Sequence, residues 1–329
     1  MLPDTYLTSI LSEFKFIFIY QVIMVYNPDV MKKFFLDASE DLNLKNPHYK
    51  KAIELYIWES YLNDLGSGDI TTELFVPNNK RIINAEIVAN DSGILAGIQE
   101  TEWFLRKLNI RIAKKMGDGE RLKKGDVIMK LSGRADKILS AERTLLNLLQ
   151  RMSGVATMTN KLVRKVPKSI RILATRKTLW GDLDKRAVSV GGGGTHRLNL
   201  SDAILIKENH IVLINNFKKF SITKSKLNNV RFIETELENL EQVNIFAKNF
   251  VKSDRYYRIA VMLDNFSPDD VMKAVKILRK TGVMIEVSGG INEKNVIKYA
   301  INGVSAISSG SITNKAPALD FSLNILTTK

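Results

Sequence analysis

Short apolar stretches alternate with helical patterns through the second half of the chain, and this alternation is the feature that most constrains its fold. Six stretches have the length and composition of strands, and helical patterns follow three of them. The expected strands are Ile170–Ala174, Ala203–Ile206, Arg231–Glu236, Ile259–Leu263, Met284–Val287 and Ala306–Ser308, and the expected helices are Asn239–Asn249, Pro268–Lys280 and Glu293–Asn302. Repeated strand–helix units predict a parallel sheet, although periodicity alone does not distinguish an α/β barrel from a doubly wound sheet.

The chain before this region mixes helices with hairpin-like strands. Apolar residues at helical spacing predict a first helix, which the glycines at Gly66–Gly68 would end. The expected elements are helices at Pro47–Leu65, Glu100–Leu108 and Ser140–Val163, strands at Ile82–Ala89 and Asp126–Leu131, and a turn-rich interval at Gly93–Gly97. This pattern predicts an α+β block ahead of the α/β region.

Cationic side chains gather just after the first two predicted strands of the α/β region, beside a run of four glycines. The set is Arg176, Lys177, Gly191–Gly194, His196, Arg197 and Lys207. Arginine can grip a carboxylate or phosphate through two hydrogen bonds, lysine supplies a compact charge, and glycine lets backbone N–H groups approach an anion. Alone, each motif has an ordinary interpretation as a linker, a solvated loop or a structural histidine. Together they predict a site for a small polyanionic ligand.

Composition narrows the alternatives. A length of 329 residues suggests two domains, and the absence of cysteine excludes disulfides, thiolate catalysis and sulfur-ligated metals, as expected of a cytoplasmic protein. The net charge of +14 raises nucleic-acid binding as an alternative. However, the cations are interleaved with Gly, Thr and apolar residues and form no basic tract with stacking aromatics. We therefore expect an anionic substrate and no nucleic-acid partner.

The segment from Phe14 to Tyr26 is aromatic and apolar. It is shorter than the roughly 20 residues that a spanning helix needs, and Lys15 interrupts it. Acidic residues precede it where a signal peptide would be basic. We interpret residues 1–30 as an extension that packs on the body, or as sequence upstream of a functional start at Met24 or Met31, and we expect no membrane partner.

An ordered series of motifs runs from about Met31 to the C-terminus. The motifs are GDITT at 68–72, AERTLLN at 141–147, SGVAT at 153–157, TRKT at 175–178, the glycine run ending in His196-Arg197, LSDAILIKENH at 200–210, ETELENLEQ at 234–242, MLDN at 262–265, EVSGGI at 286–291 and GVSAISSG at 303–310. This series resembles the quinolinate phosphoribosyltransferases, also called nicotinate-nucleotide pyrophosphorylases (carboxylating). The resemblance implies an incomplete α/β barrel of fewer than eight strands, at residues 141–311, joined to an N-terminal α+β open-faced sandwich at residues 31–140. Residues 312–329 would return to the sandwich.

The resemblance also implies the reaction and the residues that serve it. Members of the family join quinolinate to phosphoribosyl pyrophosphate and yield nicotinate mononucleotide, pyrophosphate and carbon dioxide. Residues that match those holding the quinolinate carboxylates and adjoining phosphates are Arg143, Arg176, Arg197 and Lys207, with Lys177 and His196 beside them. Residues that match the catalytic set are Lys177, Lys207, Glu236 and Asp264. Loops suited to the 5′-phosphate are Ser288, Gly289 and Gly290, and then Ser309 and Gly310.

Magnesium and a partner subunit are implied as well. Glu236 and Asp264 match acidic residues near the ribose hydroxyls and Mg²⁺, and Glu234 would lie on the same strand face as Glu236. Arg143 lies in a region that, in the family, reaches into the neighbouring subunit's site. The resemblance therefore implies a homodimer with shared active sites, or a higher oligomer.

Several residues depart from the usual family pattern. Ala174 stands where an Asp usually precedes TRKT, Leu179-Trp180-Gly181 replaces Thr-Pro-Gly, the following loop to Ala187 is shorter, and Ser305 replaces a common Asp. These changes affect the expected loop closure and substrate choice.

The alternative to quinolinate phosphoribosyl transfer is a related phosphoribosyltransferase that acts on nicotinate or on another pyridine or pyrimidine base. The intact KENH motif ending at His210 argues against the molybdenum-operon paralogue.

Overall fold

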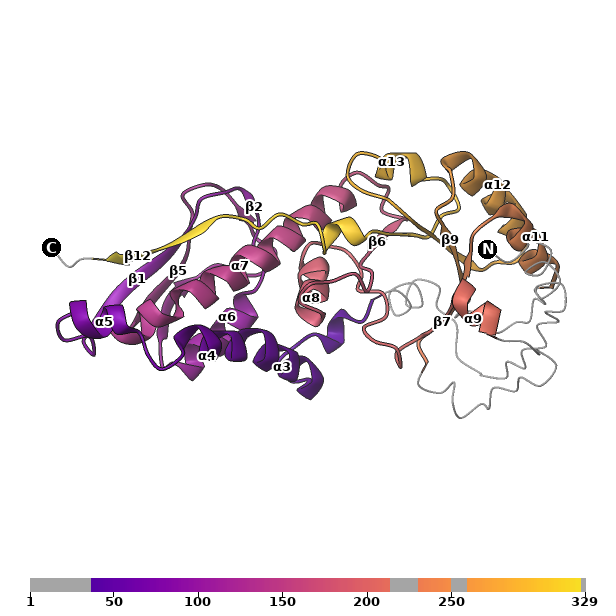
Figure 1. Cartoon of the computed structure of the whole chain (residues 1–329). Helices are drawn as coiled ribbons and strands as arrows, with labels where there is room; N and C mark the ends of the chain where they lie inside the picture. Colours follow the sequence, from indigo (N-terminus) through magenta and orange to yellow (C-terminus); the bar gives the residue numbers. More distant parts are fainter. Residues whose placement is uncertain (1–36, 214–229, 250–258, 327–329) are drawn as a thin grey trace. The chain divides into compact units, whose positions relative to one another are not determined.

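The structure is a computed structural model that describes residues 37–213, 230–249 and 259–326 (Figure 1). The expected extension at residues 1–30, with its alternative start sites, lies outside the described residues. The chain divides into two compact units. The N-terminal unit comprises Ser39–Val163, Lys177–Gly193 and the chain from Ser311, and the parallel-sheet unit is formed mainly by Arg164–Arg176 and Gly194–Gly310. These limits differ from the expected boundary at residue 140, because the long helix after it groups with the N-terminal unit.

The N-terminal unit is built on an antiparallel sheet of order β12-β1-β5-β3, with a small second sheet of order β2-β4. Its strands are β1 (Ile82–Ala89), β2 (Gly93–Ile94), β3 (Arg111–Lys115), β4 (Arg121–Leu122), β5 (Val127–Arg134) and β12 (Phe321–Leu326). Its helices are α3 (Pro47–Ile53), the π-helical turn η2 (Glu54–Trp58), α4 (Glu59–Leu65), α5 (Ile70–Phe75), α6 (Ile98–Lys107), α7 (Ala135–Val163) and α8 (Asp182–Val190). Short 3₁₀ turns lie at η1 (Ser39–Asp41) and η4 (Gly310–Ile312).

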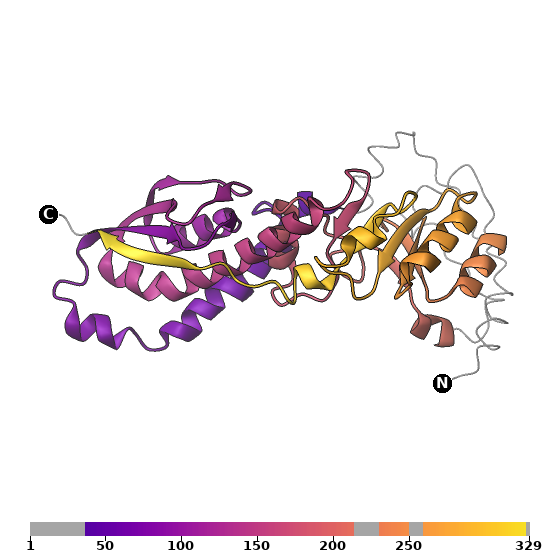
Figure 2. The same cartoon turned by 90° about the horizontal axis from the view of Figure 1, so that it is seen from above.

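One face of the antiparallel sheet is buried. In β1 the side chains of Ala85, Ile87 and Ala89 are fully buried, whereas the residues between them are partly exposed. This alternation is what a half-covered strand requires, and β1 has the expected limits. The helix α7 covers part of this sheet and packs against β1, β5 and β12 (Figure 2). It is 29 residues long and begins before the expected Ser140.

Two helices of this unit differ from the expectation. The segment from Gly181 to Ala187, expected as a loop, is largely helical and belongs to α8. Its first turn carries Asp182 and Asp184, which suit the positive end of a helix dipole. The helix α5 was not expected, although Asp69 is its N-cap and accepts a hydrogen bond from Thr72 N at 3.0 Å.

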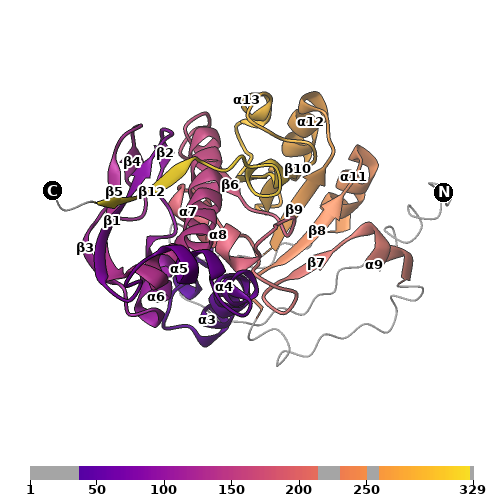
Figure 3. The same ribbon diagram turned by 60° about the vertical axis from the view of Figure 1, so that its left-hand side comes forward.

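The parallel-sheet unit holds six strands in the order β6-β11-β10-β9-β8-β7, and all five neighbouring pairs are parallel. The strands are β6 (Arg171–Leu173), β7 (Ile204–Ile206), β8 (Ile233–Leu237), β9 (Ile259–Asp264), β10 (Met284–Ser288) and β11 (Ala306–Ser308). The helices are α9 (Glu208–Leu213), α11 (Leu240–Asn249), α12 (Pro268–Leu278) and α13 (Val296–Tyr299). Figure 3 shows α11 and α12 side by side along the sheet, where they contact each other. The expected parallel sheet is confirmed, and α13 is shorter than expected.

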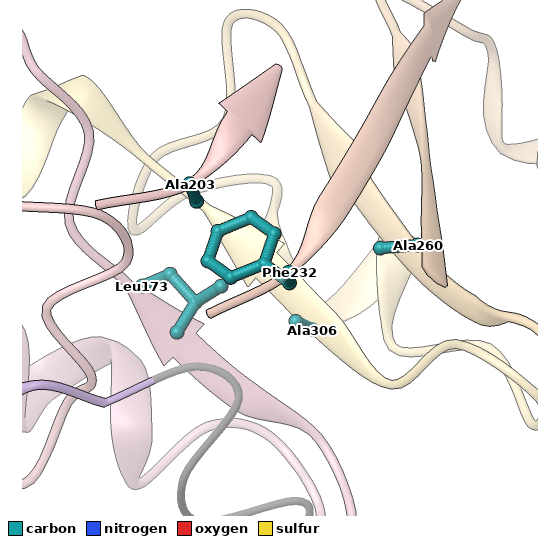
Figure 4. Packing of buried hydrophobic residues seen from close by; sticks show 5 residues of the cluster. All are labelled: Leu173, Ala203, Phe232, Ala260 and Ala306. Atoms are coloured by element: carbon teal, nitrogen blue, oxygen red, sulfur yellow. The ribbon is translucent and has the colours of Figure 1, made fainter. Parts of the chain in front are cut away.

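Strand register places acidic and small side chains on one face of the parallel sheet. Glu234 pairs with Ala260, Glu236 with Met262, and Glu286 with both Met262 and Ala306. Partners in a parallel ladder project to the same side, so these residues share a face. A compact apolar cluster also lies within this unit and consists of Leu173, Ala203, Phe232, Ala260 and Ala306 (Figure 4).

In the parts of the chain that the structure describes, no helix is long and apolar enough to cross a membrane.

Candidate active site

The carboxyl ends of the parallel strands bring most of the expected site residues to one edge of the sheet. Each strand contributes a residue at its end or shortly after it, because all six strands run in the same direction. The residues are Arg176 after β6, Lys207 after β7, Glu236 near the end of β8, Asp264 at the end of β9, Ser288 at the end of β10 and Ser309 after β11. The structure therefore gathers these residues in the parallel-sheet unit.

Arg143 and Lys177 belong to the N-terminal unit. Arg143 lies on α7 and lines a pocket of about 170 Å³ with Tyr56, Asn147 and Trp180. The backbone carbonyl of Lys177 accepts a hydrogen bond from the Thr313 hydroxyl at 2.7 Å. Trp180, one of the departures from the family pattern, thus lines the same pocket as Arg143.

Lys207 and Glu236 form an ion pair at the ends of β7 and β8. Lys207 Nζ lies 2.6 Å from Glu236 Oε2, and Glu236 is only 6% exposed. Burial raises the pKa of Glu236, the Lys207 ammonium opposes this rise, and the Asp264 carboxylate adds to it. Glu208 acts in the same direction as Asp264. Three carboxylates therefore lie within electrostatic reach of one another, and such oxygen donors suit a hard cation such as Mg²⁺.

Arg197 is buried close to a second guanidinium. It is 5% exposed, and its Nη1 donates a hydrogen bond to Ala203 O at 3.2 Å. Burial lowers the pKa of Arg197, and the like charge of Arg176 lowers it further. A buried guanidinium with an exposed guanidinium nearby favours an anion that contacts both. This geometry supports the expected anion site.

His196 lies between two buried carboxylates. Its Nε2 is 3.0 Å from Glu234 Oε2 and 3.4 Å from Glu286 Oε2. Its Nδ1 accepts a hydrogen bond from Arg197 N at 2.7 Å, and its ring packs edge-on against Phe232. Glu234, which was expected to act beside Glu236, therefore contacts His196 instead. We refer to His196, Glu234 and Glu286 as the histidine–carboxylate cluster.

Glu286 was not among the expected site residues. It stands in the EVSGGI motif, two residues before Ser288 and so on the same strand face. That spacing is the signal that could have identified it. The ligand atoms of the histidine–carboxylate cluster lie within 4.8 Å of one another, so the cluster also has the composition of a metal site.

Near neutral pH the histidine–carboxylate cluster keeps a proton that an isolated histidine or glutamate side chain would release. Burial opposes charge on the imidazole, but the Glu286 and Glu234 carboxylates outweigh it and raise the pKa of His196 to about 9. Burial and the Glu286 carboxylate raise the pKa of Glu234 to about 7. Because the Arg197 amide occupies the Nδ1 lone pair, we place the ring proton on Nε2 and the extra proton on Glu234.

The glycine run does not present its amides to a ligand, contrary to the expectation. All four N–H groups of Gly191–Gly194 donate to carbonyl oxygens within the chain at 2.8–3.0 Å. The acceptors are Ala187, Ser189, Val188 and Ile172, in that order. A side chain at Gly191 would place its Cβ 2.8 Å from Thr159 Cβ on α7. The glycines therefore end α8, and Gly191 packs closely on α7.

The two candidate phosphate loops differ. Gly289 has φ +97°, and a Cβ there would lie 2.6 Å from Asn265 N, so glycine is required for the close approach of the β9 and β10 ends. Gly290, at φ +61°, faces open space. In contrast, Ser309 donates from N to Leu173 O and from Oγ to Ile291 O, at 3.1 and 2.6 Å. Ser309 thus ties neighbouring loops together.

Comparison with known proteins gives consistent matches. A family model for the quinolinate phosphoribosyl transferase N-terminal domain matches residues 69–153, and one for the C-terminal domain matches residues 155–324. The chain is 38% identical over 268 residues to a probable nicotinate-nucleotide pyrophosphorylase [carboxylating] of Archaeoglobus fulgidus, covering 79% of this chain and 98% of that protein. It is 36% identical over 274 residues to a similarly named protein of Bacillus subtilis, covering 80% and 90%.

Solved structures give the same result. The nicotinate-nucleotide pyrophosphorylase from Francisella tularensis superimposes with a TM-score of 0.72 at 35% identity, covering 84% of this chain and 96% of that one. The protein from Ehrlichia chaffeensis of the same name gives a TM-score of 0.72 at 33% identity, covering 83% and 98%.

Proposed function

The chain belongs to the quinolinate phosphoribosyltransferase family, and we propose that it is a pentosyltransferase that joins quinolinate to phosphoribosyl pyrophosphate. The products are nicotinate mononucleotide, pyrophosphate and carbon dioxide, as a step of NAD biosynthesis. The observation that carries the proposal is the gathering of three cations in the parallel-sheet unit: Arg176 and Lys207 follow the carboxyl ends of strands, and Arg197 lies within electrostatic reach of Arg176. Both substrates are strongly anionic, and these cations would offset their mutual repulsion.

The chemistry needs positioning and charge stabilisation more than a strong base. Pyrophosphate leaves the anomeric carbon of ribose, which gains oxocarbenium character, and the pyridine nitrogen attacks from the opposite face. The ring nitrogen then carries positive charge, so the adjacent carboxylate leaves as carbon dioxide with its electron pair remaining on the ring carbon. A proton then adds to that carbon. Arg176 and Arg197 would bind the quinolinate carboxylates, and Lys177 and Lys207 the phosphates.

We also propose that Glu236 and Asp264 hold Mg²⁺ and the ribose hydroxyls. The support is their mutual electrostatic influence and the oxygen donors that they offer. Bound Mg²⁺ would neutralise charge on the pyrophosphate. Lys207 already contacts one oxygen of Glu236, so it would keep this carboxylate ionised and oriented toward the strand ends.

The 5′-phosphate would bind at Ser288, Gly289 and Gly290. Gly290 faces open space beside a loop that is held by Asn292 Nδ2 and Asn295 Nδ2, which donate to Gly290 O at 3.1 and 3.2 Å. Among the described residues, β6 and β7 are the two edges of the sheet, which supports an incomplete α/β barrel. A homodimer with shared sites and a cytoplasmic location remain predictions.

A direct assay tests the function. Quinolinate labelled in its 2-carboxylate is incubated with phosphoribosyl pyrophosphate and Mg²⁺, and labelled carbon dioxide and nicotinate mononucleotide are measured. We expect both products in equal amounts. The same enzyme is offered nicotinate, because Ala174 and Trp180 depart from the family pattern. Nicotinate mononucleotide from nicotinate, with no carbon dioxide from quinolinate, would replace the proposal with the alternative phosphoribosyltransferase.

A further inference from the structure

The histidine–carboxylate cluster places two acidic side chains where their burial is costly. Glu234 is 1% exposed and Glu286 is 2% exposed. Three of their four carboxylate oxygens make no hydrogen bond among the described residues: Glu234 Oε1 and both oxygens of Glu286. Burying a carboxylate without full hydrogen bonding is strongly unfavourable unless a nearby positive group compensates. The unfavourable burial of Glu234 and Glu286 therefore indicates that these carboxylates have a function.

The compensating groups are His196 and Arg197. His196 Nε2 faces both carboxylates, and Glu234 also interacts electrostatically with Arg197. His196 has φ +53°, in the left-handed region, which is unfavourable for a residue with a side chain. The contact from Arg197 N to His196 Nδ1, at 2.7 Å, closes this strained turn.

The imidazole thus joins the carboxylates to the backbone of Arg197. A ring that donates from Nε2 to a carboxylate keeps Nδ1 free of a proton, and only then can Nδ1 accept the Arg197 amide. If the ring lost its carboxylate partners, either nitrogen could carry the proton. Protonation of Nδ1 would set two N–H groups against each other and open the turn that leads into the Arg197 side chain.

We infer that Glu286 and Glu234 are positioning residues, which hold His196 in its Nε2–H tautomer so that its Nδ1 fixes the backbone of Arg197 and aims the guanidinium at a substrate carboxylate. That the Arg197 guanidinium points at quinolinate rests on the proposed function. The tautomer of His196 and the backbone turn between His196 and Arg197 do not. Glu286 acts through His196 and touches no substrate itself.

Kinetics test the first part. Glu286→Ala should raise the KM for quinolinate about 10- to 100-fold, because misplacing a binding group by an ångström weakens binding on that scale. The KM for phosphoribosyl pyrophosphate should change less than about twofold. Glu286→Gln keeps a side-chain oxygen of the same shape beside Nε2, so it should restore most of the quinolinate affinity. The control is Glu100→Gln, which changes an equally buried acid of the N-terminal unit and should leave both KM values unchanged.

Nitrogen NMR of histidine-labelled protein tests the second part without any substrate. The chain has three histidines, so His48→Gln and His210→Gln assign the remaining signals to His196. We expect a pyridine-type Nδ1 and a protonated Nε2 at neutral pH in the wild type, and a mixture of the two neutral tautomers in Glu286→Ala. If Glu286→Ala does not fold, the spectra of the wild type and of Glu286→Gln still show which nitrogen of His196 carries the proton.

Three results would overturn the inference. One is a protonated Nδ1 in the wild type. Another is a Glu286→Ala variant that raises both KM values equally, or neither. The third is stoichiometric zinc or manganese in the purified protein that is lost in Glu286→Gln, because the carboxylates would then be metal ligands. If His196 has the expected tautomer but the protein does not use quinolinate, the inference about the turn from His196 to Arg197 stands and only the proposed function is rejected.

Discussion

Lys207 Nζ lies 2.6 Å from Glu236 Oε2, and this contact joins the carboxyl ends of neighbouring strands β7 and β8. The lysine side chain is 41% exposed, whereas the glutamate is buried, so the ammonium is the half of the pair that a ligand can reach. The pair therefore offers an anionic substrate a cation whose position is fixed from the protein side.

Lys207→Ala should lower kcat/KM about 100-fold or more and leave the fold intact. The reason is the loss of a placed cation at a site where two anionic substrates meet, and one such donor is worth roughly that factor. Steady-state kinetics and thermal unfolding measure the two effects. Lys273→Ala, which removes an exposed lysine paired with Asp270, is the matched control and should keep full activity. A Lys207→Ala enzyme with near-normal kcat/KM would remove Lys207 from the site.

Arg176→Ala and Arg197→Lys should each nearly abolish turnover. A lysine cannot reproduce the two parallel hydrogen bonds of a guanidinium. The sequence did not predict Arg197 as a core residue, but the structure shows that it is buried. Lysine is chosen at this position because an alanine would leave a cavity. Circular dichroism establishes that the variants fold. Folded variants with wild-type turnover would contradict the anion-binding assignment.

Stability should fall as pH rises from about 5 to about 9, in part because of the histidine–carboxylate cluster. Glu234 and His196 have pKa values of about 7 and about 9 in the folded chain, above their ordinary values, so the folded state binds more protons in this window. A group of this kind stabilises the fold at low pH and loses that contribution as pH rises through its folded pKa. Urea unfolding at several pH values measures the slope, which should be smaller in Glu234→Gln. An equal slope in that variant would show that the proton lies elsewhere.

Asp184→Asn should destabilise the N-terminal unit by about 3 kcal/mol. Asp184 is fully buried and accepts two hydrogen bonds from Arg151, at 2.9 and 2.7 Å, and one each from Leu179 N and Trp180 N. The change would leave the Arg151 charge without its partner. Glu293→Gln, which breaks an exposed pair with Lys165, should cost less than about 1 kcal/mol. Equal melting shifts in the two variants would refute the argument.

The sequence was most informative where periodicity and burial agree. β1 has the predicted limits because its alternation reflects one covered face, and the parallel strands lie where apolar stretches predicted them. It was least informative for α8, because the buried side of this helix includes the charged residues Asp184 and Lys185, and only the contact with α7 reveals that side.

The candidate site shows the same limit. Motif order identified His196, Arg197 and Glu236, but it could not reveal that the Gly191–Gly194 amides donate hydrogen bonds to carbonyl oxygens of the chain itself. It also could not reveal that Glu286 meets His196, because these residues are 90 positions apart and only strand register brings them together. Hydrogen-bond partners depend on tertiary contacts, which a linear pattern does not contain.

The last prediction concerns the partner subunit. Arg143 lies on α7 in the N-terminal unit, whereas Arg176, Arg197 and Lys207 belong to the parallel-sheet unit. We expect a dimer in which Arg143 completes the site of the other subunit. Arg143→Ala and Lys207→Ala should each be inactive alone, but mixing them should regenerate activity, because a heterodimer then contains one site with both residues intact. Subunit exchange is verified first by co-purification of differently tagged chains. If exchanged heterodimers are as inactive as either parent, the shared-site model is wrong, and Arg143 serves either its own subunit's site or the fold.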